Sequence, residues 1–228
     1  MALPTATPDD KSGTVGKIIH LHQSFRFMAP EQPPPDTRTV DSFLALLRSR
    51  RTIVSFQRRP VPGDLVRKAL DAGRFAPNHK LTEPWRFTVI GEETRRIVEE
   101  GWADFATSRL SADATSERRD EARRASLEKV RGKPAIVIVT QTLDPDPVRR
   151  EEDYAAVAAA IQNIQLAAWA MGLGCQWSTS AATRAPVVLA PASIPSTERV
   201  VGFLFLGYPA VVPEVSRKPL DVVARWLP

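Results

Sequence analysis

The segment Ala76-Pro77-Asn78-His79-Lys80-Leu81-Thr82-Glu83-Pro84-Trp85-Arg86-Phe87 joins a polar loop to an apolar run that ends at Ile90. The run from Phe87 to Ile90 has the β-branched and aromatic content of a buried strand. The loop before it contains two prolines and no glycine, so its backbone is restricted. Polar loops held ahead of a core strand often carry ligand-binding groups. The segment therefore predicts a core strand preceded by a ligand-binding loop.

The bulk composition is that of a globular protein. The chain has 228 residues, 43% of them hydrophobic and 25% charged, which predicts one domain with appendages. No apolar stretch reaches membrane-spanning length, and the first residues lack the pattern of a secretory signal. One cysteine, Cys175, and three histidines argue against a disulfide framework and against a metal enzyme. We expect a cytoplasmic protein without a bound metal or a membrane partner.

The net charge of +5 and the pI of 9.7 raise the question of nucleic-acid binding. Basic residues are, however, interleaved with acidic ones, as in Glu117-Arg-Arg-Asp-Glu-Ala-Arg-Arg124. On a helix this pattern gives a solvated face with local ion pairs. The charge pattern therefore argues against a nucleic-acid partner and fits an enzyme whose cofactors carry phosphates.

Residues 1–38 are predicted to be a mobile N-terminal extension, and residues 39–228 to be the folded domain. Pro33-Pro34-Pro35 is incompatible with a helix or a sheet ladder. Asp41 is the expected N-cap of a helix over residues 42–50. The remaining predicted elements are helices over 63–74 and 184–190, a charged helical region over 93–131, and strands over 87–90, 135–140 and 199–206.

An alanine-rich segment from Glu151 to Met171 is the strongest helix prediction, because alanine has the highest helix propensity. Apolar residues occur nearly all round this helix, which predicts burial. Its small side chains allow another helix to approach closely. We expect it at the centre of a homodimer interface, and we expect Gly172-Leu173-Gly174 to end it.

Four segments resemble, in order and spacing, the FMN-dependent nitroreductase family, including its short members with His-Lys in the loop. They are Arg50-Arg51-Thr52, the loop from Phe75 to Trp85, Gly172-Leu173-Gly174-Cys175-Gln176-Trp177-Ser178-Thr179, and Arg217 before Pro219-Leu220. The resemblance implies an α+β fold, with a mixed sheet flanked by helices in an interlocked homodimer. It also implies FMN in sites formed by both subunits, without a Rossmann fold.

Arg50, Arg51 and Thr52 place two guanidinium groups and a hydroxyl at consecutive positions. Arginine presents a planar fork of donors that matches phosphate oxygens. The alternative is an ordinary basic helix end, favoured by the helix dipole. The resemblance implies that these residues hold the FMN phosphate and ribityl chain and that Arg217 reaches the phosphate. Val54 and Val215 stand where the family commonly has basic residues.

For the other segments, the resemblance implies contacts to the flavin and to the nicotinamide nucleotide. His79 is the loop's candidate donor to the cofactor, or simply a surface histidine. Leu81 and Glu83 replace the family's usual Asn and Gln, and Glu83 could instead pair with a nearby Lys or Arg. The implied flavin contacts are Phe75, Pro77, Asn78, His79, Lys80, Leu81, Glu83, Gly174, Trp177, Ser178 and Thr179. The implied nucleotide contacts are Ala167, Ala168, Trp169, Ala170, Met171 and Gly172.

The region over 93–131 begins with two aromatic residues, Trp102 and Phe105. Two hypotheses remain open for them. They stack on a planar acceptor beneath a mobile lid, or they anchor the helix to the core. Cys175 is expected to be a small buried residue, because no motif pairs it with a catalytic histidine.

The sequence thus predicts an FMN-dependent oxidoreductase that takes hydride from NADH or NADPH and passes it through the flavin to an electron-poor acceptor. Nitroaromatics, quinones and free flavin are candidate acceptors. No catalytic side chain is named, because the flavin carries the chemistry. The alternatives are a flavin-fragmenting or reductively dehalogenating enzyme of the same fold, a non-enzymatic flavin-binding module, and a relative that has lost its cofactor.

Overall fold

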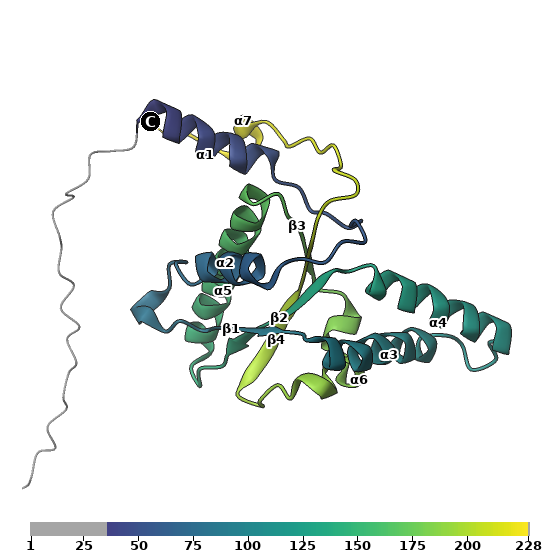
Figure 1. The fold of residues 1–228 in the computed structure, drawn as a ribbon. Helices are drawn as coiled ribbons and strands as arrows, with labels where there is room; N and C mark the ends of the chain where they lie inside the picture. The colour runs from purple at the N-terminus through teal and green to yellow at the C-terminus, as the bar shows by residue number, and fades with distance from the viewer. Residues whose placement is uncertain (1–35, 228) are drawn as a thin grey trace, which may run out of the picture.

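The computed structural model describes residues 36–227, so the predictions for residues 1–35 lie outside its description. Within that range a four-stranded sheet has the order β1-β2-β4-β3 (Figure 1). Its strands are β1 (Trp85–Val89), β2 (Ala135–Thr142), β3 (Gly174–Ser178) and β4 (Glu198–Gly207). All three strand pairs are antiparallel, and an isolated parallel bridge joins Thr52 to Cys175. The predicted α+β class is confirmed.

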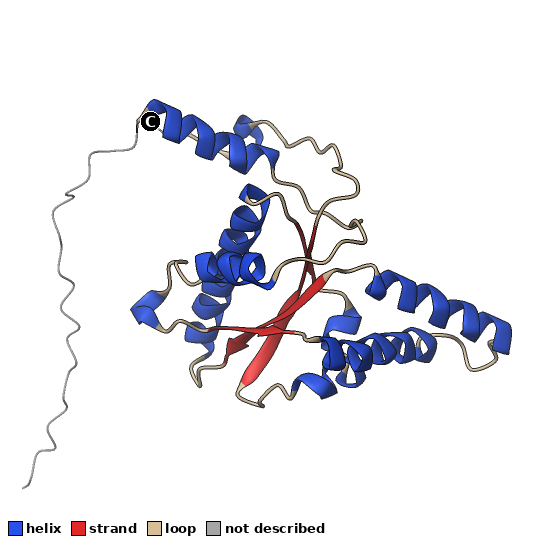
Figure 2. Ribbon diagram, in the orientation of Figure 1, coloured by secondary structure: helices blue, strands red, loops and turns tan. Residues whose placement is uncertain are grey.

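The α-helices of the described residues are α1 (Thr37–Ser49), α2 (Gly63–Gly73), α3 (Glu92–Ser108), α4 (Ser116–Arg131), α5 (Pro147–Ala170), α6 (Pro186–Leu189) and α7 (Leu220–Val223). Helices α2 and α5 pack on one face of the sheet and α3 and α6 on the other, whereas α1 and α7 project away from it (Figure 2). Short 3-10 turns are η1 (His79–Leu81), η2 (Ala181–Arg184) and η3 (Ala190–Ala192).

The sheet separates two apolar clusters. Strand β2 alternates between them: Val137 and Val139 face the cluster built with α2 and α5, whereas Ile136 and Ile138 face the cluster built with α3 and α6. All four side chains are at most 1% exposed. The period-two alternation of a strand explains how one run of apolar residues serves both faces.

The predicted N-cap of the first helix was wrong, and the helix predicted to begin at Glu151 begins at Pro147. Helix α1 begins at Thr37 because Asp36, not Asp41, is its N-cap, with the Asp36 carboxylate accepting from Thr39 N at 2.8 Å. The charged region over 93–131 is two helices, and Thr115 caps the second of them. Gly172, at φ +76°, follows the end of α5, as predicted.

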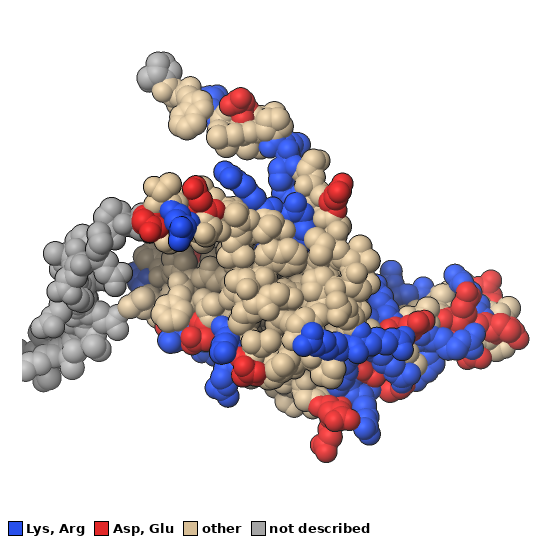
Figure 3. All heavy atoms as spheres, turned by 45° about the horizontal axis from the view of Figure 1, so that its top comes forward, with Lys and Arg blue, Asp and Glu red and all other residues tan. Residues whose placement is uncertain are grey.

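Charged side chains of both signs are mixed along α3 and α4 (Figure 3). Several form ion pairs, among them Arg123 with Asp104 at 2.6 Å and Arg118 with Glu121 at 2.6 Å. This is the solvated, locally paired surface that the sequence pattern predicted. Among residues 36–227, no helix is long and apolar enough to cross a membrane, and no group of three or more potential metal ligands is gathered.

Helix α1 and the C-terminal segment with α7 project together away from the body (Figure 1). Helix α1 contains no buried residue. Phe43 of α1 is 54% exposed, and Trp226 and Leu227 of the tail are 81% and 72% exposed. A 13-residue helix with an unburied apolar face is marginal in water. Helix α1 and the C-terminal segment with α7, together called the arm, therefore expose an apolar surface that is suited to pack against another protein surface.

Candidate cofactor site

Three guanidinium groups gather where the arm leaves the body. Arg50 follows α1, Arg51 is its neighbour, and Arg217 comes from the tail. Burial lowers the pKa of Arg50, and the nearby charges of Arg217 and Arg51 lower it further. Among residues 36–227, none of the three is paired with a carboxylate. Figure 3 shows basic side chains at this junction. Like charges held together without acids are suited to an anion.

The polar contacts of these arginines hold them in place without using all their donors. Arg50 Nη1 donates to Gln165 Oε1 at 3.3 Å, which ties the guanidinium to α5. Arg51 Nη1 donates to the carbonyls of Arg48 and Arg50, at 2.6 and 3.0 Å. Arg51 Nε is buried and has no partner within the described residues. A buried donor without an acceptor is costly, so this group fits a ligand oxygen.

A cavity of about 820 Å³ lies beside Arg51. Trp169 lines it from α5, and its Nε1 donates to Ser49 Oγ at 3.0 Å. The tail segment 212–216 lines the opposite side and includes one acid, Glu214. The volume is within the range of small-molecule and cofactor sites. Trp169, predicted to contact a nicotinamide nucleotide, thus borders the same cavity as the predicted phosphate residue Arg51.

The segment after the arginines is locked to β3. Thr52 forms the parallel bridge with Cys175, and Ile53 N donates to Cys175 O at 3.1 Å. A Cβ atom on Gly174 would lie 2.5 Å from Ile53 Cγ1, so only glycine allows this approach. Cys175 is 3% exposed, and burial raises its pKa to about 12. Cys175 is therefore buried, as predicted, and its thiol is protonated at neutral pH.

The predicted flavin loop has a strained backbone. Lys80, Leu81 and Glu83 all have positive φ, at 55°, 53° and 42°. Non-glycine residues adopt this region rarely, and such strain concentrates at functional sites. One hydrogen bond within the loop and one to α5 hold it: Asn78 Oδ1 accepts from Glu83 N at 2.9 Å, and Thr82 Oγ1 donates to Asp153 Oδ1 at 2.6 Å. The loop is therefore built to present a fixed shape.

Two residues of the loop, His79 and Glu83, make contacts within the chain. His79 Nδ1 lies 2.9 Å from Glu152 Oε2, so this ring nitrogen is engaged with α5. Glu83 forms no ion pair with any described residue; instead its carbonyl accepts from Arg86 Nη1 at 2.9 Å. A cavity of about 310 Å³ lies between Pro77, Asn78 and the alanine face of α5.

One chain does not bring the loop to the arginines. His79 contacts Glu152 near the start of α5, whereas Arg50 contacts Gln165 near its end. Thirteen residues of α-helix separate the two contacts by roughly 20 Å. Figure 1 shows the loop after α2 and the segment after α1 at different ends of α5. Within this chain, the loop and the arginines therefore contact opposite ends of α5.

The sequence model of the nitroreductase family matches residues 47–208, which include most of the predicted site. The chain belongs to the nitroreductase family. The Bacillus subtilis (strain 168) protein YfhC, provisionally named an NAD(P)H nitroreductase, is 32% identical over 174 residues, or 76% of this chain and 87% of that protein. This nitroreductase-family chain is accordingly an oxidoreductase.

Solved structures agree with that assignment. A nitroreductase-like family protein from Bacillus cereus is similar with a TM-score of 0.70 and 28% identity, over 86% of this chain and 99% of that one. A protein from Desulfovibrio desulfuricans, provisionally named a nitroreductase and solved with FMN, has a TM-score of 0.61 and 26% identity, covering 82% and 96%. The predicted nitroreductase-like fold is thereby confirmed.

Two predicted contacts conflict with the packing of this chain. Ala168 is fully buried inside α5 and cannot touch a nucleotide. Trp102 is 8% exposed and packs edge to face on Phe203, with ring centroids 5.5 Å apart. The hypothesis that Trp102 anchors its helix to the core fits this packing. Stacking on an acceptor does not, because core aromatic side chains enclose the ring. Phe105 is half-buried beside the same cluster, and its acceptor role stays a prediction.

The other predicted residues differ in exposure. Trp177 is half-buried, and its Nε1 is a buried donor without a partner among the described residues. Phe75 is 68% exposed beneath the Arg74 guanidinium. Other residues predicted to contact the flavin or the nucleotide are exposed: Thr52, Pro77, Lys80, Leu81, Thr179, Ala170, Gly172 and Arg217. Four more are half-buried: Asn78, Ser178, Ala167 and Met171.

Sequence reasoning missed three buried polar residues that organise the site. Gln165 and Asp153 are 7% and 3% exposed and hold Arg50 and Thr82. Lys133 is 6% exposed, and its Nζ donates to Val54 O at 2.7 Å and Gln176 Oε1 at 3.1 Å. For Gln165 and Asp153, the available signal was a polar residue at a core-facing position of an alanine-rich helix, which requires a partner.

Proposed function

We propose that the chain is an FMN-dependent NAD(P)H oxidoreductase that acts as a homodimer. The observation that carries the proposal is the cluster of Arg50, Arg51 and Arg217, in which the buried Nε of Arg51 has no partner within residues 36–227. An FMN phosphate would supply acceptors for these donors. Relatives provisionally named NAD(P)H nitroreductases, and the FMN bound in a solved neighbour, support the same assignment.

The cluster's chemistry favours a dianionic phosphate over a neutral ligand. Arg51 offers a donor whose other contacts are already fixed by two carbonyls, so its position is set before a ligand arrives. Arg50 is oriented by Gln165, and burial makes its charge more effective because water screens it less. Preformed donors reduce the conformational cost of binding.

The second half of the site is proposed to come from a partner subunit. The strained loop over 77–83 is roughly 20 Å along α5 from the arginines of its own chain. The arm formed by α1 and the tail exposes a large apolar surface, including Phe43 and Trp226. A second copy that packs on this arm would bury its apolar surface and complete the cofactor site of each subunit. The small side chains on the alanine face of α5 would let the two subunits approach closely.

When bound, FMN supplies reversible hydride chemistry that no side chain of this protein provides. The protein residues position and shield it. The arginines fix the phosphate, and the segment from Thr52 to Ile53 is fastened to β3 through Cys175 O. Trp177 places a half-buried ring near the end of β3, and its indole N–H has no partner in the described part of the chain. The acceptor is an electron-poor molecule: a nitroaromatic, a quinone or free flavin.

The test combines cofactor analysis with one substitution. The purified protein should carry FMN and oxidise NADH or NADPH in the presence of a quinone or a nitroaromatic. Arg51→Gln should weaken FMN binding by about ten- to a hundredfold, since a charged hydrogen bond is worth about 1.5–3 kcal/mol. Arg109→Gln, an exposed arginine at the end of α3, is the matched control and should leave FMN affinity unchanged.

Sedimentation tests the shared site. The protein should be a dimer at micromolar concentration, with two FMN per dimer. A monomer that binds FMN as tightly as the dimer would contradict the shared site. FMN affinity that is equal in Arg51→Gln and in the wild type would contradict the phosphate assignment.

A further inference from the structure

A second cavity, of about 590 Å³, shares no lining residue with the one beside Arg51. It lies between the segment that follows the Phe56–Pro209 bridge and the C-terminal half of α4. Arg58 and Arg59 line it from the first side, and Arg124 and Arg131 from the second. One acid, Glu128, stands among these four arginines, so the lining is strongly positive.

The arginines differ in how they are held. Arg58 and Arg124 are exposed, and neither forms an ion pair with a described residue. The Arg59 guanidinium lies 3.9 Å from the ring centroid of Tyr208. Arg131 Nε is 3.2 Å from Glu99 Oε2. The cavity therefore combines two positioned guanidinium groups with two whose donors are available to a ligand.

The first wall is fixed to the end of β4. Gln57 N donates to Tyr208 O at 2.9 Å, and Gln57 Nε2 donates to Pro209 O at 2.9 Å. Pro60 follows at the cavity edge and restricts the backbone there. The arginines of this wall therefore project from a segment that two backbone-directed hydrogen bonds anchor.

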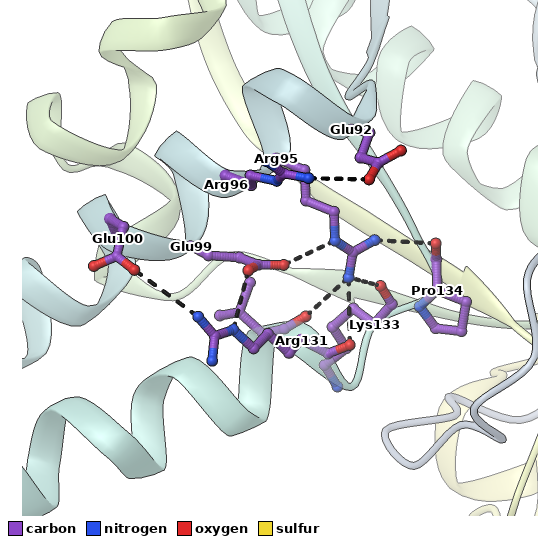
Figure 4. Close-up of polar contacts among 9 residues, drawn as sticks. Glu92, Arg95, Arg96, Glu99, Glu100, Arg131, Lys133 and Pro134 are labelled. Atoms are coloured by element: carbon purple, nitrogen blue, oxygen red, sulfur yellow. Dashed lines mark hydrogen bonds and ion pairs between the residues drawn. The ribbon is translucent and has the colours of Figure 1, made fainter.

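The second wall is fixed by a half-buried arginine (Figure 4). Arg95 of α3 donates to the carbonyls that follow α4: Nη2 to Lys133 O at 2.5 Å and Nη1 to Pro134 O at 3.1 Å. Its Nε donates to Glu99 Oε1 at 2.8 Å, and Glu99 also holds Arg131. Residues 124, 127, 128 and 131 are spaced so that they share one face of α4. The contacts of Arg95 and Glu99 therefore fix the position of this face of α4 at the cavity.

We propose that this cavity binds a phosphate-bearing ligand of mononucleotide size with a planar, apolar body. Arginine forks match phosphate oxygens and also stack on planar rings. Leu127, Pro60 and Pro134 supply apolar lining between the charges. The volume is within the range that holds such ligands. The site is independent of the flavin assignment, because the two cavities have no residue in common.

The experiment uses the FMN-loaded protein and ADP as the probe, measured by calorimetry. ADP should bind saturably with one site per chain. Arg58→Gln and Arg124→Gln should each weaken ADP binding by about tenfold or more. Neither residue forms an ion pair among residues 36–227, so both variants should retain wild-type FMN content and thermal stability. Arg67→Gln, an exposed arginine on α2, is the control and should bind ADP like the wild type.

Two further probes separate the parts of the ligand. Adenosine lacks the phosphates and pyrophosphate lacks the planar body, so each should bind at least tenfold more weakly than ADP. Absent ADP binding, or ADP affinity that is equal in Arg58→Gln, Arg124→Gln and the wild type, would overturn the proposal. So would ADP binding that is lost in Arg51→Gln alone, which would place ADP in the flavin site. Pyrophosphate that binds as tightly as ADP would refute the apolar subsite.

Discussion

Gly174→Ala tests whether the close approach between β3 and the segment after the arginines supports the cofactor site. The new Cβ would lie 2.5 Å from Ile53 Cγ1 and 2.6 Å from Ile53 Cβ, and Ile53 is fully buried. Overpacking in a core costs about 1–3 kcal/mol. Replacing a strand glycine by alanine returns about 0.5–1 kcal/mol. We therefore expect a net destabilisation of about 1–2 kcal/mol.

The same substitution should weaken FMN binding. Ile53 can move away from β3 only by carrying Thr52 and the arginines with it, because Ile53 N donates to Cys175 O. The expected loss is about tenfold, as for one weakened charged hydrogen bond. Urea unfolding at fixed protein and FMN concentrations measures the first effect, and fluorescence titration with FMN the second.

Two comparisons make the result decisive. Gly63→Ala has no atom within 4 Å of the new Cβ and should not be destabilised, because alanine is the better helix former. In Gly174→Ala/Ile53→Ala the loss should be smaller than the sum of the single changes by about 0.5–3 kcal/mol. Wild-type unfolding free energy and FMN affinity in Gly174→Ala would refute the reasoning.

Two other predictions concern groups outside the cofactor contacts. Burial raises the pKa of Cys175 from 9.0 to about 12, so iodoacetamide at pH 8 should alkylate the urea-unfolded chain and spare the native one. The native state then holds the thiol proton more tightly than the unfolded state, so stability should fall as pH rises from about 9 to about 12, an effect that Cys175→Ala should remove. Glu99→Gln should lower the unfolding free energy by about 1–3 kcal/mol, because its buried carboxylate holds Arg95 and Arg131. The control Glu92→Gln, in an exposed pair, should change it by less than about 0.5 kcal/mol in urea unfolding.

The parts of the fold that sequence reasoning found are those with a strong local signal. The run from Ala135 to Thr140 is apolar and β-branched, and it forms most of β2. The alanine-rich segment forms α5 because helix propensity and burial act in the same direction. Strand β3 was not predicted, because Gly174 to Ser178 has mixed polarity and is a strand only through its pairing with β4.

The candidate site shows the same division. The consecutive arginines could be recognised from their type, since a phosphate needs such donors. The partner of Arg50 could not, because Gln165 is 115 positions away in the sequence. The positive φ angles of Lys80, Leu81 and Glu83 were also out of reach, since a loop without glycine gives no sign that its backbone enters the left-handed region.

That strained loop links the fold to the proposed assembly. Three non-glycine residues in the left-handed region cost about 1–2 kcal/mol each. Within the chain, Asn78 and Asp153 oppose this cost with one hydrogen bond each, to Glu83 N and Thr82 Oγ1. A typical hydrogen bond contributes only about 0.5–1.5 kcal/mol, so these contacts offset part of the strain. If a second subunit and FMN supply the remainder, cofactor binding, dimer formation and the ordering of the loop are thermodynamically linked. FMN should then stabilise the dimer as well as the fold.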